Sequence, residues 1–372
     1  MSSYTKQPAS YAPSPPDHYP LSRLLAVDKI ESGIETPSGN KYDRFQSKIC
    51  PLIPGTTAGS YGGHVYGHAA YAASKTVKRG FMLHNVTGSF TMPGIKGIPF
   101  VFHVTHVRDG GTYCLRSVEV RQRDETCFSC LCSFKRPETR GNTFSHQPVC
   151  DYEEKYKLTL GGKKKEDHPL APGTDSPAFA REVKLGIRPA VQFSGVQIRK
   201  VNMMKYNKSV GYSGHPERYR QIHFYRMMGL PGNDDEQGGA REHTESQLAS
   251  ELRKEDDNGA FDNLHICGHL FASDRNSLYL AAWALEKVDN INRIASLSHT
   301  VIIHTHDPAK FRMYDWDAAK EEDRAKWFTI EASTGRSGEN RILHQGQIWT
   351  DDGTLLATTL QDGLLRENEP KL

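Results

Sequence analysis

The same order of predicted elements occurs twice along this chain of 372 residues, and this repetition constrains the fold most. Residues 61–77, "YGGHVYGHAAYAASKTV", predict a helix, which is followed by apolar-rich strand candidates at 81–90, 99–110, 112–122 and 126–136. A second helix, predicted to start near Asp274, is followed by strand candidates at 295–306, 326–336, 340–350 and 353–366. Because the period is far longer than that of a solenoid repeat, we predict a duplicated α+β domain. In each copy an antiparallel sheet wraps around one long helix.

The segments around the two copies are polar or rich in proline and glycine. We predict copies at 21–150 and 181–366, a linker at 151–180, a disordered tail at 1–20 and a C-terminal tail at 367–372. An acidic, glycine-rich stretch at 229–259 is predicted to be a surface insertion with a short helix at 245–254.

The charge balance gives no reason to expect a nucleic-acid partner. The net charge is only +3, and the lysine run in "GGKKKED" contains no aromatic residue, which is typical of a solvated loop. No secretory signal or membrane-spanning run is present in the sequence. We therefore expect a globular protein with neither a nucleic-acid partner nor a membrane span.

Three of the seven cysteines lie close together, at Cys127, Cys130 and Cys132. The C-x-x-C spacing invites a zinc or redox interpretation. However, the segment alternates as a strand, where residues three apart point to opposite faces, and no second C-x-x-C completes a four-ligand site. We predict buried, reduced thiols and no metal site.

Several familiar catalytic motifs are missing. The chain has no G-x-S-x-G nucleophile elbow, no P-loop and no G-x-G-x-x-G sequence. The 17 histidines show no metal-ligand spacing. The sequence motifs that mark hotdog dehydratases and hydratases are also absent.

Asp274 stands at the predicted start of the apolar helix in "HLFASDRNSLYLAAWAL". Burial of a lone carboxylate is costly unless it is paired or hydrogen-bonded. Two interpretations follow from the residues alone: Asp274 caps the helix, or it carries out chemistry. The two roles are compatible, because different lone pairs can serve each.

Taken in order, several segments resemble the type II acyl-CoA thioesterases, which are double-hotdog proteins of bacteria and of eukaryotic peroxisomes. The similar segments are residues 61–77, "LHNVTGSFTMPG", "VRDGGTYCLRSVEVRQ", "FASDRNSL", "ASLSHTVIIH" and "LLATTLQDGLLR". The resemblance covers most of residues 20–150 and 180–366. It departs from the family at Tyr61, where Phe is usual, and at His64 and His68, where Gln is more frequent.

The resemblance implies a tandem hotdog fold and hydrolysis of fatty acyl-CoA without a metal or redox cofactor. The family's catalytic Asp, Thr or Ser, and Gln fall on Asp274, Ser296 and Gln361. A carboxylate can act as the base for a water molecule, and the hydroxyl and amide can position that water. Taken singly, Ser296 and Gln361 would read as ordinary strand residues.

A further hypothesis concerns Gly63 and His64 at the start of the first helix. Free backbone N–H groups at a helix N-terminus can stabilise a developing oxyanion. We predict that this terminus binds the thioester across the interface between the copies. The alternative is that Gly62 and Gly63 only form the turn into the helix.

The chain ends in Pro370, Lys371 and Leu372, which share two letters with the peroxisomal signal S-K-L. Together with the resemblance, this end predicts a peroxisomal location and an import receptor as partner; otherwise the protein is expected in the cytoplasm. A homo-oligomer is also expected from the family. Two other functions stay open at this point: a hotdog enoyl-CoA hydratase or dehydratase, and a non-catalytic acyl-CoA binding protein.

Overall fold

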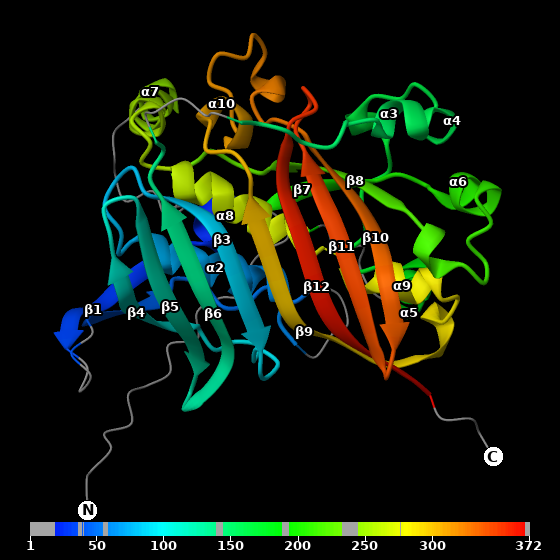
Figure 1. Ribbon diagram of the computed structural model, residues 1–372, viewed down its shortest axis with the longest axis horizontal. Coiled ribbons are helices and arrows are strands. Elements are labelled where there is room, and N and C mark those ends of the chain that lie inside the picture. Colours follow the sequence, from blue (N-terminus) through cyan, green and yellow to red (C-terminus); the bar gives the residue numbers. More distant parts are fainter. Residues whose placement is uncertain are drawn as a thin grey trace, which may run out of the picture.

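The computed structural model describes residues 19–35, 39, 41–54, 59–138, 144–187, 193–232, 245–275 and 277–368. Within these residues one continuous antiparallel sheet of 12 strands runs the full width of the molecule (Figure 1). Its order is β1-β2-β4-β5-β6-β3-β9-β12-β11-β10-β8-β7. The sequence order on either side of β3 and β9 therefore mirrors itself, as the predicted duplication requires.

Each half of the sheet contains six strands. Those of the first half are β1 Val27–Glu35, β2 Lys41–Ser47, β3 Met82–Phe90, β4 Val101–Asp109, β5 Tyr113–Gln122 and β6 Glu125–Lys135. Those of the second half are β7 Val196–Lys200, β8 Gln221–Met227, β9 Ile291–Ile303, β10 Phe328–Gly338, β11 Arg341–Trp349 and β12 Leu355–Glu367. Strands β3 and β9 join the halves, with Thr87 paired to Thr300.

Two central helices pack against one face of this sheet, and they lie behind the strands in Figure 1. They are α2 Gly62–Ser74 and α8 Asp262–Ser273. Alanines dominate α2, because Ala favours helix and leaves room for close packing, and Ala69, Ala70, Ala72 and Ala73 are fully buried. Where α2 meets α8, a Cβ on Gly67 would lie 3.0 Å from the carbonyl oxygen of Cys267, so the two backbones approach closely. The tandem hotdog prediction is confirmed.

The remaining helices surround the central pair and, apart from α7, have eight residues or fewer. They are α1 Leu21–Leu24, α3 Tyr152–Lys155, α4 Lys157–Leu160, α5 Pro177–Lys184, α6 Met204–Ser209, α7 Glu245–Asp257, α9 Ser277–Ala284 and α10 Pro308–Phe311. Single 3₁₀ turns occur at Lys165–Asp167, Pro216–Arg218, Val288–Asn290 and Glu321–Asp323. Helix α9 continues beyond α8 and contacts strands β9 to β12.

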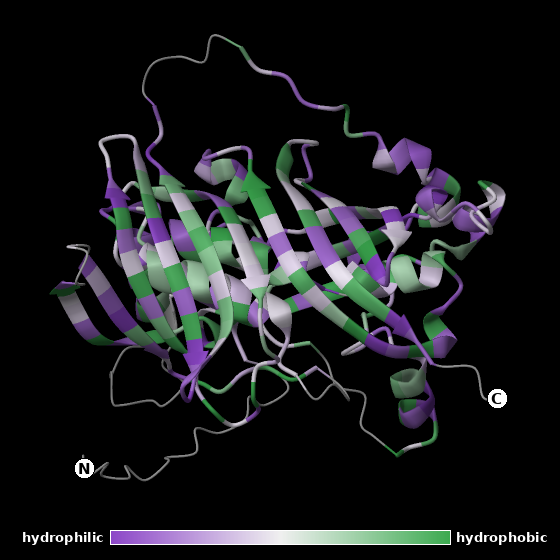
Figure 2. Cartoon of the chain, turned by 60° about the horizontal axis from the view of Figure 1, so that its bottom comes forward, coloured by the Kyte–Doolittle hydropathy of each residue, from purple (hydrophilic) through white to green (hydrophobic). Residues whose placement is uncertain are grey.

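The strands alternate between hydrophobic and hydrophilic residues, which appear as bands in Figure 2. This pattern places one set of side chains against the helices and the other toward solvent. In the first half the buried set is mostly apolar, for example Phe102, Val118 and Val120, although β5 also buries Arg116 and Gln122.

The segments outside the two copies are only partly described. Residues 1–18, 233–244 and 369–372 lie outside the described residues, so most of the two predicted tails and the middle of the insertion are not tested. Helix α7 covers the short helix predicted in the insertion. The predicted linker at 151–180 holds α3 and α4, and its Tyr152 and Tyr156 pack with Trp349 in a small buried cluster. The exact domain boundaries stay a prediction.

Candidate active site

Asp274 lies in the break between α8 and α9, not at the start of a helix. Helix α8 begins at Asp262 and ends at Ser273, and Asp274 is its C-terminal capping residue. The prediction that the second central helix starts near Asp274 is therefore wrong: the helix that starts after Asp274 is α9, and the central helix α8 ends just before it. The polar residues His265 and His269 obscured the apolar pattern of α8, although both are fully buried. His269, for example, donates from Nε2 to the Phe311 carbonyl oxygen, and its Nδ1 accepts a hydrogen bond from Tyr225 Oη.

The two oxygens of the Asp274 carboxylate are bound from different halves of the molecule. Oδ2 accepts a hydrogen bond of 2.7 Å from the Gly63 N–H at the start of α2. Oδ1 accepts one of 2.6 Å from Gln361 Nε2 on β12. The first N–H groups of a helix have no partner within the helix and carry a partial positive charge, so α2 offers a natural site for a carboxylate. The site therefore lies at the interface between the two hotdog copies.

Gln361 connects Asp274 to Ser296. The same Nε2 atom donates to Ser296 Oγ at 2.7 Å, so one amide nitrogen contacts both of the other predicted residues. Gln361 itself is fully buried. The structure thus brings Asp274, Ser296 and Gln361 together, as the family resemblance implied, although their catalytic roles remain predictions.

A β-bulge turns Ser296 toward the site. Asp362 pairs with Ser298 and Gly363 pairs with Ser296, so Leu297 is left without a partner in the ladder. In a regular strand Ser296 and His299, three positions apart, would point to opposite faces. The extra residue at Leu297 places both on the inner face, where Gln361 also lies.

Two glycines allow α2 to approach the carboxylate. A Cβ on Gly62 would lie 2.8 Å from Asp274 Oδ2, and a Cβ on Gly63 would lie 2.5 Å from the Phe271 carbonyl oxygen. Real Cβ atoms do not occupy such positions without movement of their neighbours. Both positions therefore require glycine for contact between the two halves.

Burial raises the pKa of Asp274 to about 6. The hydrogen bonds from Gln361 and Gly63 oppose this shift, as do weaker effects of Ser277 and Arg275. A carboxylate of this kind is largely ionised at neutral pH but is more basic than an exposed one, which suits a general base. The location at the C-terminal end of α8, where the helix dipole is negative, further disfavours the charge.

His299 is a neighbour of Asp274 that the sequence interpretation missed. Its Nδ1 lies 3.9 Å from Asp274 Oδ1, and its ring stacks on Tyr66 of α2 with centroids 4.6 Å apart. Burial lowers its pKa to about 3, so the imidazole is neutral. Strict strand alternation would have placed His299 opposite Ser296, and no sequence signal marked the bulge that brings it to the same face.

Gly63 and His64 have different surroundings. The Gly63 N–H binds Asp274 directly, whereas the His64 N–H donates to the Tyr61 carbonyl oxygen at 3.1 Å. The His64 ring bonds backbone at both nitrogens: Nδ1 accepts from Leu52 N–H at 3.0 Å and Nε2 donates to the Leu24 carbonyl oxygen at 2.8 Å. The side chain thus holds the first copy together. The substrate-binding role predicted for these two residues stays a prediction.

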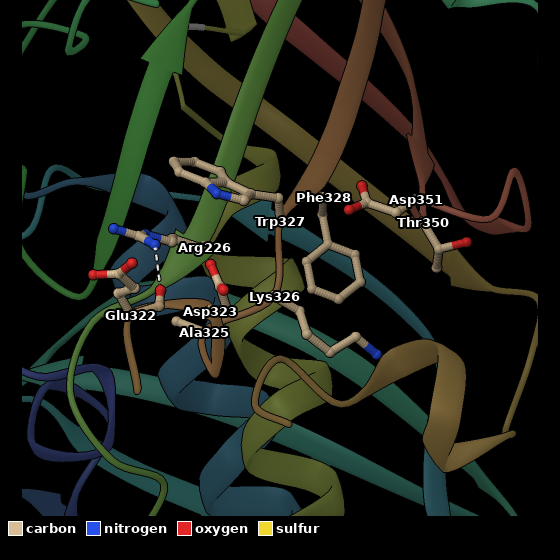
Figure 3. A pocket seen from close by; sticks show the side chains of 9 residues that line it. All are labelled: Arg226, Glu322, Asp323, Ala325, Lys326, Trp327, Phe328, Thr350 and Asp351. Carbon is tan, nitrogen blue, oxygen red and sulfur yellow. Dashed lines mark hydrogen bonds between the residues drawn. The ribbon is translucent and has the colours of Figure 1, made fainter. Parts of the chain in front are cut away.

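A separate cavity of about 240 Å³ opens at the edge of the second copy (Figure 3). It is lined by Arg226, Glu322, Asp323, Ala325, Lys326, Trp327, Phe328, Thr350 and Asp351. The Arg226 guanidinium lies 4.7 Å from the Trp327 ring centre and donates to the Glu322 carbonyl oxygen. Three carboxylates line this cavity, whereas Asp274, Ser296 and Gln361 do not. We therefore assign it no role in binding an anionic substrate.

The three clustered cysteines lie inside the first copy. Cys127, Cys130 and Cys132 on β6 are buried, and the sulfurs of Cys130 and Cys132 are 3.7 Å apart. Among the described residues, no group of three or more His, Cys, Asp or Glu side chains is arranged to hold a metal ion. Likewise, no helix within the described ranges is long and apolar enough to cross a membrane.

Comparison with known proteins gives consistent matches. The family model of the acyl-CoA thioesterase N-terminal domain matches residues 53–135, and that of the C-terminal domain matches residues 212–365. Acyl-coenzyme A thioesterase 8 of Mus musculus is 24% identical over 309 residues, which cover 82% of this chain and 80% of the relative.

Two solved structures share the fold. The acyl-CoA thioesterase II of Mycobacterium marinum has a TM-score of 0.58 at 21% identity, covering 95% of this chain and 99% of its own. A hot dog fold protein of Alicyclobacillus acidocaldarius has a TM-score of 0.58 at 13% identity, covering 94% and 98% of the two chains. These likenesses support the tandem hotdog architecture.

Proposed function

This chain belongs to the acyl-CoA thioesterase family, and from that membership we propose that it hydrolyses fatty acyl-CoA to a free fatty acid and CoA. The observation that carries the proposed site is the position of Gln361 Nε2, 2.6 Å from Asp274 Oδ1 and 2.7 Å from Ser296 Oγ. Three side chains from separate elements thus meet at one atom, next to the N-terminus of α2.

Asp274 is the base in this mechanism. A water molecule held against the carboxylate loses its proton to Asp274 as its oxygen attacks the thioester carbonyl carbon. The carbon–sulfur bond then breaks, the acid leaves, and the proton passes from Asp274 to the CoA thiolate. The pKa of Asp274, raised by burial to about 6, suits both proton transfers.

Ser296 and Gln361 position the water. Gln361 Nε2 donates to Ser296 Oγ, which leaves the serine hydroxyl hydrogen free to point at a water molecule. A fixed water next to the base lowers the entropic cost of reaching the transition state. The N-terminus of α2, at Gly63 and His64, supplies positive potential for the developing oxyanion, while the Gly63 N–H donates to Asp274 and the His64 N–H to the Tyr61 carbonyl oxygen.

The proposal is tested by CoA release from a panel of short to long acyl-CoA thioesters, followed with a thiol reagent. We expect turnover by the wild-type protein and a loss of roughly 10²–10⁴-fold in kcat for Asp274→Asn, the range typical of a lost general base. Thermal unfolding checks that both proteins are folded. Folded wild-type protein that releases no CoA from any member of the panel would contradict the proposed function. Equal turnover by the two proteins would keep the activity but remove Asp274 as the base.

We also propose a peroxisomal location and a homo-oligomeric state. The location is supported by Pro370, Lys371 and Leu372, which lie outside the described residues. Deletion of Leu372 should abolish import if these residues form the signal. Unchanged matrix localisation of the deletion variant would contradict it, and the elution volume on size exclusion tests the oligomer.

A further inference from the structure

The inner face of the second half of the sheet is polar where a hotdog core is expected to be apolar. On β11 and β12, His344 pairs with Gln361, and Gly346 pairs with Thr359. On the other side of β12, Gln361 pairs with His299. The side chains of His344, Thr359, Gln361 and His299 are each at most 2% exposed. They form a continuous patch that starts at Asp274.

This patch contains several buried polar atoms without a hydrogen-bond partner among the described residues. They are His344 Nδ1, Thr359 Oγ1, His299 Nδ1, Gln361 Oε1 and, at the far side, His223 Nε2. Each unpaired buried polar group costs roughly 1–3 kcal/mol, so such groups are rare and need a reason. In an enzyme core such groups are normally paired with ordered water or with a polar group of a bound ligand.

The members of the patch lie close to one another. A Cβ on Gly346 would lie 2.6 Å from Thr359 Oγ1 and 3.4 Å from His344 Cε1, so the hydroxyl and the ring both lie over this glycine. At the other end, His299 Nδ1 lies 3.9 Å from Asp274 Oδ1. Thr359 and His344 thus occupy the space that a side chain at position 346 would need. The unpaired atoms of the patch therefore lie on neighbouring strands that lead away from the reacting centre, and the described residues hold other such atoms elsewhere.

We propose that the inner face of the second copy binds an uncharged oxygen group, a hydroxyl or a ketone, on the acyl chain of the substrate, with Thr359 and His344 as its direct partners. This inference rests on the proposed hydrolysis of acyl-CoA. The acyl chain starts at the carbonyl carbon beside Asp274 and must extend along a neighbouring surface. A purely hydrocarbon chain on this patch would leave all of its polar atoms unpaired.

The chemistry of the patch selects an uncharged group. Burial lowers the pKa of His344 to about 4 and that of His223 to about 3, so both rings are neutral at physiological pH. The neutral imidazole of His344 and the Thr359 hydroxyl offer both donors and acceptors but no counter-charge for a carboxylate. The cations near His223, at the far side, are Lys200, which pairs with Asp175, and Arg275. A hydroxyl group, which donates and accepts, satisfies two of the unpaired atoms at once.

The test uses matched pairs of acyl-CoA thioesters of equal length, one saturated and the other carrying a single hydroxyl or keto group, with that group moved along successive carbons. We expect one position to raise kcat/KM at least tenfold over the saturated partner. A site built to hydrogen-bond a substrate group discriminates strongly against the analogue that lacks it. The variants Thr359→Val and His344→Phe should reduce this ratio to about one, because each removes a partner of the oxygen group.

Thr358→Val is the matched control, because Thr358 is the adjacent residue on β12, points to the outer face and bonds His304 Nε2 at 2.8 Å. It should keep the wild-type preference. Thermal unfolding provides a second measurement: Thr359→Val removes an unpaired buried hydroxyl and should unfold at the same or a higher temperature than the wild type.

The possible results separate this inference from the proposed function. Equal or faster turnover of the saturated thioesters at every length and position would overturn the inference, since the patch would then hold ordered water only, while thioester hydrolysis would stand. A preference for oxygenated chains that survives both substitutions would also overturn it. The absence of turnover with every thioester would contradict the proposed function, and the inference with it.

Discussion

The central helices of the two copies end in opposite ways. Helix α2 is followed by Lys75, which is exposed, whereas α8 is followed by Asp274, which is 8% exposed. A positive charge suits the negative C-terminal end of a helix, and a buried carboxylate there does not. The first copy thus follows the rule that stabilises helices and the second copy violates it. Violations of this kind are expected at functional sites.

The same contrast extends to the sheet. Under α2 the inner face carries apolar residues such as Phe102 and Val118 and a buried Arg116 that is hydrogen-bonded, while the inner face of the second copy carries His344 and Thr359, each with an unpaired polar atom. The first copy contributes a rigid helix N-terminus to the site, and the second contributes the reactive and hydrogen-bonding side chains. In the duplicated fold the first half thus supports the site, and the second half supplies the side chains proposed to react.

The contact of the first copy with the carboxylate can be broken at Gly62. Gly62→Ala places a methyl group 2.8 Å from the present position of Asp274 Oδ2 and forces the carboxylate or α2 to move. We expect kcat/KM to fall about 100-fold, since displacements near 1 Å at a reacting group have effects of this size. The measurement is CoA release. Gly111→Ala, whose Cβ meets no atom within 4 Å, is the control and should behave as wild type.

The role of the second copy can be sharpened at Ser296. Ser296→Ala removes the hydroxyl that Gln361 Nε2 contacts at 2.7 Å but leaves Asp274 in place. We expect kcat to fall about tenfold to 100-fold with little change in KM, because a positioning group acts in the transition state. Ser298→Ala, two residues along β9 and on the outer face, is the matched control. A similar loss in both variants would mean that the strand, not the hydroxyl, is responsible.

The pH dependence reports the charge on Asp274. Only the ionised carboxylate can accept a proton, and its pKa is raised by burial to about 6. Activity should therefore reach a plateau above about pH 7 and fall close to tenfold per pH unit well below 6. A profile of kcat/KM between pH 4.5 and 8 measures this. A midpoint near 4, as for an exposed aspartate, would contradict the assigned environment.

The smallest expected effect concerns stability. The folded-state pKa of Asp274, about 6, is above its ordinary value of 3.8, so the neutral form is favoured in the folded protein. The stability that this group contributes is present below pH 4 and is lost as the pH rises through 6. Asp274→Asn does not titrate and should gain up to about 3 kcal/mol relative to wild type between pH 4 and pH 8. Thermal unfolding of both proteins across this range is the measurement, and a constant difference would contradict it.

Much of the fold followed from pattern alone. The strands next to the central helices were predicted in the right order, because each shows alternation bounded by short turns. Three strands at or next to the edges of the sheet, β1, β2 and β7, were not predicted. In β1, "VDKIESGIE", no residue is fully buried, so there was no apolar face to recognise. Edge strands owe their position to pairing with a neighbour, which local sequence does not record.

The sequence predicted which residues form the site, but not the contacts between them. The resemblance indicated Asp274, Ser296 and Gln361, but it could not show that Gly63, 211 positions away, donates to the same carboxylate. Nor could it show the bulge at Leu297 that turns Ser296 inward. The error in the start of the second helix has a similar origin, because His265 and His269 are satisfied by tertiary hydrogen bonds that the sequence does not display.

The polypeptide between β6 and β7 makes the two copies one covalent chain, and β3 and β9 hold them together through strand pairing. In a symmetric pair of separate subunits, every substitution appears twice, so a change that helps one site alters its mirror image as well. A fused chain escapes this coupling. One copy can keep Lys75 and an apolar interior while the other evolves an acidic helix end and a polar interior. A homodimer contains one sequence twice, so its two halves must be the same. Because this chain connects two copies of different sequence, its two halves can differ.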